Sequence, residues 1–188
     1  DQMRKLQSYT DEGSPGRDWN VATGMVIEGK AGFQIMGDWA KGEFTAAGKT
    51  PGVDYYCSPT PSNNGYLYNV DSFIFYKTSD PDKQEGQKLL AKLMMGKNFQ
   101  KVFNLYKGSI PARLDVSMDE FDKCAKTSNA DIKTAGASGG LVPSFAHGMA
   151  QGNTMKAALQ DIITEHFNSD MSSVDAANAL ADSVLANM

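Results

Sequence analysis

The sequence has few of the side chains on which most enzymes and metal sites depend. Its 188 residues include two histidines, His147 and His166, and two cysteines, Cys57 and Cys124. No Cys-x-x-Cys or His-x-x-x-His spacing occurs, so no zinc site is expected. A Ser-His-Asp triad would have to use one of the two histidines as its base. No P-loop and no Gly-x-Gly-x-x-Gly follows a predicted strand, so the sequence predicts no cofactor.

Long apolar runs and concentrated basic charge are also absent. No run of about 18 apolar residues occurs, so no transmembrane helix is predicted. The net charge of -4 argues against nucleic-acid binding, which needs a clustered basic face. The longest basic grouping, residues 97–107, is interleaved with aromatic residues at helical spacing and is interpreted as a solvated helix face. The chain opens with Asp1-Gln2-Met3, so we expect a mature or internal start.

The two cysteines leave two possibilities open. They fit a single disulfide in an oxidising compartment, or two inert buried thiols in the cytosol. Counting cysteines does not decide between these states, because both have the same sequence.

Several helices are marked by their ends. Asp80 followed by Pro81 predicts the start of a helix. The apolar stripe of this helix predicts that one of its faces is buried. That stripe consists of Leu89, Leu90, Leu93 and Met94. The helix that follows ends at Lys107-Gly108, because Ile110-Pro111 cannot continue it.

Further helices are expected near both ends of the chain. Asp18 can cap a helix that begins at Trp19, and Ser172 can cap the last helix. Ser117 with Glu120 three residues later predicts a capping box for a helix that carries Cys124.

Strands are predicted between these helices, so the fold class is α/β. Phe33 and Ile35 alternate as on a half-buried strand. The run 66–76 is rich in aromatic and β-branched residues, which favours strands on both sides of Asp71. Gly37-Asp38 breaks the first strand and places Trp39 where a helix begins. Ligands of open α/β sheets bind at the carboxyl ends of strands, although Trp39 is equally compatible with a core position.

The residues around Trp39 also carry a resemblance. Gly29-Lys30-Ala31, a short strand and Gly37-Asp38-Trp39-Ala40 resemble carbohydrate-binding solute-binding proteins of ABC transporters. A Pro-rich crossover at 59–61 and Lys107-Gly108-Ser109-Ile110-Pro111 extend the likeness over nearly the whole chain. Within that family the chain is most similar to the periplasmic glucose- or mannose-binding proteins.

The resemblance implies a helix-rich carboxyl-terminal portion of a two-lobe periplasmic-binding-protein fold of type II. Residues 1–58 and 108–188 are expected to form the carboxyl-terminal lobe. Residues 59–107 are expected to form a crossover segment that contributes to the amino-terminal lobe. The missing amino-terminal part of the same protein would complete that lobe.

The resemblance also implies a sugar site. A sugar needs an aromatic plate for its C–H face and paired donors and acceptors for its hydroxyls. Trp39 is expected to stack on the ring, Asp71 to accept, Lys107 to donate, and His147 to do either. Each has a structural alternative. Trp39 could be a core residue, and Asp71 an edge or bulge residue that is hydrogen-bonded to the backbone. Lys107 could complement the helix dipole at a helix end, and His147 could be a structural residue of a loop.

The expected function is non-catalytic binding of a monosaccharide in the periplasm. Glucose is the first expectation, with galactose and mannose as alternatives. The expected protein partner is the membrane permease of an ABC transporter. In that oxidising compartment Cys57 and Cys124 are expected to form a disulfide. A fragment of a carbohydrate-active hydrolase stays open because carboxylates are numerous, as does a protein-interaction module without a ligand.

Overall fold

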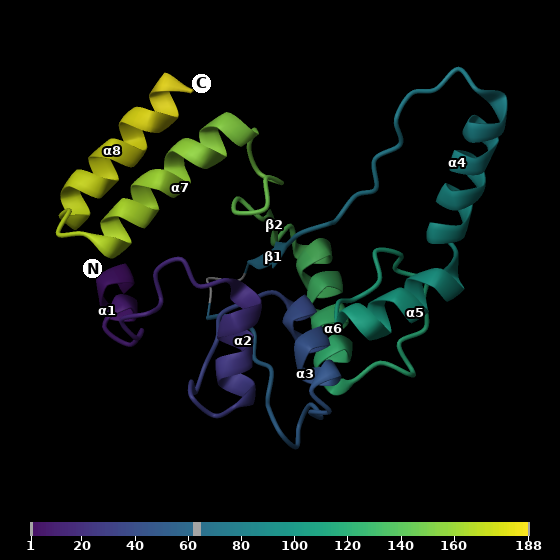
Figure 1. Ribbon diagram of the computed structural model, residues 1–188, viewed down its shortest axis with the longest axis horizontal. Coiled ribbons are helices and arrows are strands. Elements are labelled where there is room, and N and C mark those ends of the chain that lie inside the picture. Colours follow the sequence, from purple (N-terminus) through teal and green to yellow (C-terminus); the bar gives the residue numbers. More distant parts are fainter. Residues whose placement is uncertain (1, 62–64, 188) are drawn as a thin grey trace. The chain divides into compact units, whose positions relative to one another are not determined.

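The computed structural model describes residues 2–61 and 65–187, and its regular structure is mainly helical (Figure 1). The helices are α1 (Gln2–Gln7), α2 (Trp19–Ile27), α3 (Lys41–Ala46), α4 (Pro81–Met94), α5 (Lys97–Lys107), α6 (Lys123–Ser138), α7 (Asn153–Asn168) and α8 (Ser173–Ala186). A 3-10 turn, η1 (Asp38–Ala40), precedes α3. The strands are β1 (Tyr66–Tyr68) and β2 (Leu141–Pro143). No helix in the described parts of the chain is long and apolar enough to cross a membrane.

The two strands form one small sheet, which confirms the α/β class. The amide of Tyr66 donates to the carbonyl of Gly140, and the amide of Ser144 donates to the carbonyl of Tyr68. The residue numbers rise together along both strands, so the strands are parallel.

Two of the predicted strands are wrong. Residues 31–37 have no regular structure, and Phe33 is 96% exposed. Residues 70–76 are also irregular beyond β1, although Phe73 and Phe75 have high strand propensity. A strand forms only when a neighbouring strand supplies its hydrogen bonds. Within the described residues, neither segment has such a partner.

The chain divides into two compact units. The first contains residues 1–17, 67–69 and 142–188, and the second contains 18–66 and 70–141. These units follow contacts within this chain, whereas the predicted lobes belong to a longer protein. The assignment of 1–58 and 108–188 to one lobe, and of 59–107 to the other, therefore stays a prediction.

The first unit is built on α7 and α8, which lie side by side as a helical hairpin (Figure 1). Ser172 caps α8 by accepting from the amide of Asp175 at 3.0 Å, as predicted. The buried imidazole of His166 bonds through Nδ1 to the carbonyl of Met171 at 2.9 Å. Arg4 of α1 donates to the same carbonyl at 2.6 Å, so one carbonyl ties α1 to the loop between α7 and α8.

The second unit has its core around α3 and the start of α6. Its buried apolar residues are Ala40, Phe44, Val116, Phe121, Ala125 and Ala135. The rings of Phe44 and Tyr55 stack with centroids 4.1 Å apart. Cys57 and Cys124 form the predicted disulfide, with their Cα atoms 5.7 Å apart. The disulfide and the stacked rings fix residues 55–57 to this core.

Helix α4 begins as predicted but is not buried as predicted. The carboxylate of Asp80 accepts from the amides of Asp82 and Lys83, and Pro81 is the first helical residue. Leu89 is 60% exposed and Leu93 is 61% exposed. The amphipathic pattern identifies the apolar face of a helix, but burial needs a surface opposite that face. The described residues of this chain supply too little of one.

Helix α6 begins later than its predicted cap. Asp122 caps it by accepting from the amide of Ala125 at 2.8 Å. The hydroxyl of Ser117 instead accepts from the amide of Asp119 in a local turn. Two potential caps lie five residues apart here, and the aspartate prevails.

Candidate functional site

Trp39 lies in the 3-10 turn that leads into α3. A Cβ atom at Gly37 would lie 2.1 Å from the nearest ring carbon of Trp39, so the indole folds back over this glycine. No other residue type leaves room for the ring in that position. Ala40, the next residue, is buried, whereas Trp39 itself is partly exposed. The turn therefore holds an aromatic side chain at the surface of a packed unit.

Asp71 and Lys107 form an ion pair, although 36 residues separate them in the sequence. The Lys107 side chain is 29% exposed and that of Asp71 is 64% exposed, so solvent and ligands can reach the pair. The ammonium of Lys107 also lies 5.8 Å from the centre of the Phe103 ring. Two of the four predicted site residues are thus brought together by the fold.

The turns that carry Trp39 and Lys107 are in close contact. Lys107 is the last residue of α5, and Gly108 ends the helix in a left-handed conformation with φ 88°. A Cβ at Gly108 would lie 2.7 Å from the amide nitrogen of Gly42. A Cβ at Gly42 would lie 2.9 Å from the carbonyl oxygen of Lys107. Glycine on both sides lets the two backbones approach, and this places Trp39 and Lys107 on adjoining turns.

Asp38 connects these turns and was not predicted as a functional residue. Its Oδ2 atom accepts a hydrogen bond from the amide of Ile110 at 3.2 Å. Burial raises the pKa of Asp38, while Lys41, the Ile110 amide, Ser109 and Lys107 oppose that rise. In the sequence Asp38 is only a turn residue, because no local pattern indicates a partner 72 residues away.

His147 belongs to the other compact unit, in the loop between β2 and α7. Its Nδ1 atom lies 2.6 Å from the hydroxyl of Ser144. Ser144 is 2% exposed, and its amide donates to the carbonyl of Tyr68. The loop therefore fixes one nitrogen of the imidazole. The place of His147 in a site with Trp39, Asp71 and Lys107 stays a prediction.

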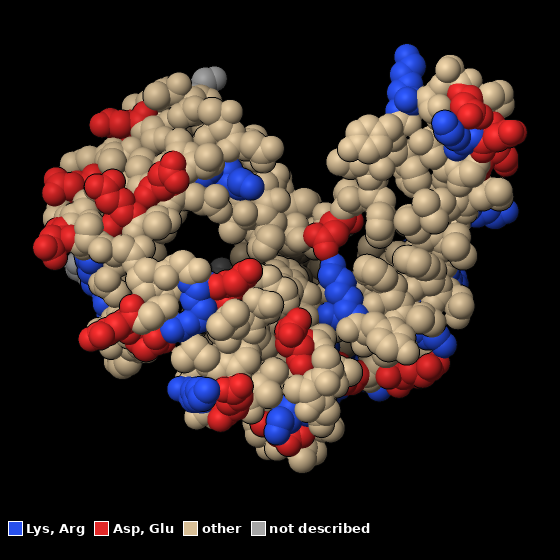
Figure 2. All heavy atoms as spheres, in the orientation of Figure 1, with Lys and Arg blue, Asp and Glu red and all other residues tan. Residues whose placement is uncertain are grey.

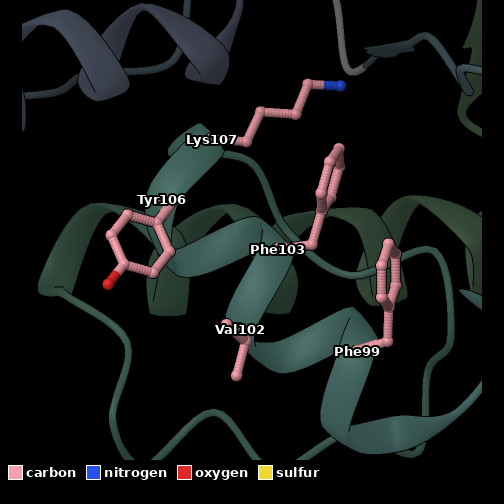
Figure 3. A pocket seen from close by; sticks show the side chains of 5 residues that line it. All are labelled: Phe99, Val102, Phe103, Tyr106 and Lys107. Atoms are coloured by element: carbon pink, nitrogen blue, oxygen red, sulfur yellow. The ribbon is translucent and has the colours of Figure 1, made fainter.

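An open apolar groove of about 530 Å³ follows α5 next to Lys107 (Figure 3). Its lining residues are Phe99, Val102, Phe103, Tyr106 and Lys107. The rings of Phe99 and Phe103 stack with centroids 5.4 Å apart. Figure 3 shows the Lys107 side chain extending over the same side of the helix as Phe103. The ammonium therefore lies on the same side of α5 as the stacked rings of Phe99 and Phe103.

Arg113 has a structural role in the turn after α5. Its guanidinium donates to both carboxylate oxygens of Asp115, each at 2.8 Å, and to the carbonyl of Met95 at 3.0 Å. Lys97 joins the pair at 3.0 Å from Asp115. The Arg113 guanidinium and Lys97 hold the pKa of Asp115 well below its usual range. This network closes the loop after α5.

In the described residues, neither the Gly-x-Ser-x-Gly letters nor the potential metal-binding side chains are arranged as the corresponding catalytic or metal motif. Residues 136–140 have the letters Gly-x-Ser-x-Gly, but they end α6 and do not form a strand-to-helix elbow. The Ser138 hydroxyl donates back to the carbonyl of Thr134. Residues 2–61 and 65–187 contain no group of three or more potential metal-binding side chains.

The face drawn in Figure 2 also bears on nucleic-acid binding. Lysine and arginine side chains of the described residues are scattered there among acidic ones (Figure 2). They do not merge into an extended basic surface on this face. A protein that tracks a phosphate backbone gathers its basic side chains on one surface.

Comparison with known proteins places the chain in a family. Residues 1–134 match the family model described as bacterial extracellular solute-binding protein. A probable sugar-binding periplasmic protein of Brucella suis is 47% identical over 185 residues, which are 98% of this chain and 44% of that protein. An uncharacterised ABC transporter extracellular-binding protein of Pyrococcus horikoshii is 33% identical over 162 residues, 86% of this chain and 35% of that protein. A xylose/arabinose-binding protein of Haloferax volcanii is 26% identical over 180 residues, 95% of this chain and 38% of that protein.

The chain spans less than half the length of these relatives. The family match nevertheless covers most of the chain, including Trp39, Asp71 and Lys107. It agrees with the predicted helix-rich α/β class and with the predicted location outside the cytoplasm. The chain belongs to the bacterial extracellular solute-binding protein family.

Proposed function

We propose that the protein containing this chain binds a monosaccharide reversibly, without catalysis, and delivers it to the membrane permease of an ABC transporter. The observation that carries the proposal is the Asp71–Lys107 ion pair on a turn that adjoins the Trp39 turn. Relatives named as sugar-binding periplasmic proteins support the ligand class. The relative from Pyrococcus horikoshii supports the transporter context.

The chemistry of the three side chains suits a sugar. A carboxylate accepts hydrogen bonds from hydroxyl groups, and an ammonium donates to their oxygens, so the pair can serve both roles of adjacent hydroxyls. The pair is accessible to solvent, so a ligand can exchange for water at little cost. Trp39 would supply the apolar plate for the C–H face of the ring.

The proposed site also includes His147 and a movement of two lobes. His147 would add a donor or an acceptor according to its tautomer. Residues 59–61 and 107–111 would act as hinges between the lobe of 1–58 and 108–188 and the lobe to which 59–107 contributes. Closure around a ligand is a common motion of two-lobe binding proteins.

The identity of the sugar is the finer part of the proposal. Glucose is the first candidate, with galactose and mannose next, because the sequence most resembles glucose- and mannose-binding proteins. One relative is named for xylose and arabinose, so pentoses belong in the test. Epimers differ by the direction of one hydroxyl, and the affinity for each depends on how Asp71, Lys107 and His147 meet that hydroxyl.

Calorimetric titration of the full-length protein against these five sugars tests the proposal. We expect saturable binding of at least one sugar, which is recovered chemically unchanged. Asp71→Asn and Lys107→Met should each weaken binding by roughly tenfold or more, since a buried hydroxyl then loses a charged partner. Asp182→Asn on α8 is the matched control and should leave affinity unchanged. Turnover of oligosaccharides would instead establish a hydrolase, and the absence of any sugar binding would refute the proposal.

A further inference from the structure

Asp38 has a contact that local structure alone does not explain. An aspartate in the first turn of a helix usually accepts from amides of its own helix. Its carboxylate oxygen Oδ2 instead bonds the amide of Ile110, which lies 72 residues later in the turn after Lys107. We infer that Asp38 is a positioning residue that holds the Trp39 turn against the Lys107 turn. Its effect on sugar affinity rests on the proposed function, whereas the connection itself does not.

The surroundings of Asp38 hold its carboxylate in place. Burial raises the pKa of Asp38, and the positive charges of Lys41 and Lys107 oppose that rise. Ser109 is buried and follows Gly108 directly. The carboxylate therefore accepts from the Ile110 amide of this turn, at a place where burial and the charges of two lysines act on its pKa in opposite directions.

Close packing surrounds this hydrogen bond. A Cβ at Gly108 would lie 3.1 Å from the carbonyl oxygen of Asp38 and 2.9 Å from the Cβ of Lys41. The turn after Lys107 thus lies directly against the backbone of the Trp39 turn. Moving the turns apart would lengthen the Asp38–Ile110 bond, and moving them together would press backbone atoms against each other.

Lys41 extends the connection into the core of the same unit. Its ammonium lies 2.8 Å from Asp122, and its side chain is only 6% exposed. Asp122 caps α6 one residue before Lys123, and Cys124 in that first turn bonds to Cys57. The Trp39 turn is therefore anchored to α6 on one side and, through Asp38, to the Lys107 turn on the other.

The hydrogen bond to Ile110 explains why an aspartate occupies position 38 although the position is partly buried. Burial works against a charged carboxylate, so an apolar or amide residue would cost less at this position. What this place requires is an oxygen acceptor opposite the Ile110 amide, and the short side chain of Asp38 supplies one. Trp39 is the next residue after Asp38, and Lys107 is three residues before Ile110. The Asp38–Ile110 hydrogen bond therefore joins the two turns that carry the predicted sugar-binding residues Trp39 and Lys107.

Three substitutions in the full-length protein separate geometry from charge. Asp38→Asn keeps an oxygen acceptor at the same distance. Asp38→Glu keeps the charge but moves the carboxylate by one methylene. Asp38→Ala removes the acceptor. Asp54→Ala is the matched control, because the carboxylate of Asp54 accepts a local hydrogen bond, from the amide of Thr50 at 2.7 Å.

Hydrogen exchange of the Ile110 amide is the first readout and needs no sugar. Exchange should accelerate by about tenfold or more in Asp38→Ala and Asp38→Glu, since the amide loses its acceptor. Asp38→Asn should stay within about threefold of the wild type, because its side-chain oxygen still accepts. Asp54→Ala should match the wild type. Unchanged exchange in Asp38→Glu overturns the inference. Because Asp38→Glu retains the charge, it provides this test even if Asp38→Ala fails to fold.

Sugar titration is the second readout and uses the panel sugar that the wild type binds most tightly. Affinity should fall by roughly tenfold in Asp38→Glu and recover to within about threefold in Asp38→Asn. A purely electrostatic role predicts the reverse order and would overturn the inference. If the wild type binds none of the sugars, the proposed function fails, while the exchange measurement still decides whether Asp38 joins the two turns.

Discussion

The ammonium of Lys107 pairs with the Asp71 carboxylate and lies 5.8 Å from the centre of the Phe103 ring. An ion pair as exposed as Lys107–Asp71 contributes at most about 1 kcal/mol to folding. Stability alone therefore gives little reason to join these residues across 36 positions. Charged groups held near each other at low cost to the fold suit a ligand that needs a donor and an acceptor side by side.

Trp39 yields the first residue-scale prediction. Trp39→Ala in the full-length protein should weaken sugar binding by roughly tenfold to a hundredfold, because an aromatic plate buries a large apolar area against the ring. Circular dichroism should change little, since the indole is partly exposed and packs over Gly37. Tyr9→Ala, at an aromatic residue that is 76% exposed, is the control. Unchanged affinity combined with a large loss of stability would show that Trp39 is a core residue.

Asp11 yields a prediction of pH dependence. A hydrogen bond from Arg17 lowers the pKa of Asp11 to about 2. A depressed pKa in the folded state stabilises folding above the ordinary pKa of an aspartate, about 4, and that stabilisation is lost as the pH falls toward 2. In Arg17→Met the carboxyl should titrate near its ordinary value. NMR of protein with ¹³C-labelled aspartate measures both, and equal pKa values in the two proteins would refute the ion pair.

At the scale of elements, features that depend on neighbouring residues were predicted correctly, whereas features that depend on distant residues were not. The helix starts at Asp18, Asp80 and Ser172 follow from one residue and the amides next to it, and all three are present. The strand expected at Phe33 and Ile35 is absent, because strand formation depends on a neighbour that no local pattern supplies. The same limit hid Asp38, whose partner Ile110 lies in a distant turn.

The candidate site was predictable from sequence only in part. Trp39, Asp71 and Lys107 stood out because each interrupts or ends a regular pattern. The chemistry of each residue could be inferred from the sequence. The ion pair between Asp71 and Lys107 could not, because their separation of 36 residues does not show how the chain folds back between them through α4 and α5. The resemblance to a family supplied the expected role of each residue toward a sugar, but not the ion pair.

Gly108 yields the element-scale prediction. Gly108→Ala should lower the free energy of unfolding by more than the roughly 1–2 kcal/mol of a left-handed alanine, because its Cβ would also press on the amide of Gly42. Gly48→Ala is a matched control: φ at Gly48 is 71°, and its Cβ would meet nothing within 4 Å. Denaturant unfolding measures both variants. Equal losses would mean that the two turns do not press together.

At the scale of the whole molecule, the second unit exposes a large share of its apolar side chains. Phe73, Ile74, Leu89, Leu93 and Tyr106 are each more than half exposed. Large exposed apolar surfaces are typical of interfaces. The relatives are more than twice as long as this chain, so a longer protein has further residues with which to cover them.

The prediction at this scale concerns the 188 residues in isolation. They should self-associate and should not bind a sugar tightly, because exposed apolar surface favours association and the lobes of the proposed cleft are incomplete. Light scattering with titration of the isolated chain measures both properties. A monodisperse monomer with micromolar or better affinity for one of the sugars would show that the residues named here suffice for binding.

The central claim is that Trp39, Asp71 and Lys107 contact a sugar. A crystal structure of the full-length protein, grown with the panel sugar that it binds most tightly, tests this claim most directly. We predict a sugar ring stacked on the indole of Trp39, with hydroxyl groups within hydrogen-bond distance of the Asp71 carboxylate and the Lys107 ammonium. A sugar bound elsewhere, with the Asp71–Lys107 pair undisturbed, would contradict the account.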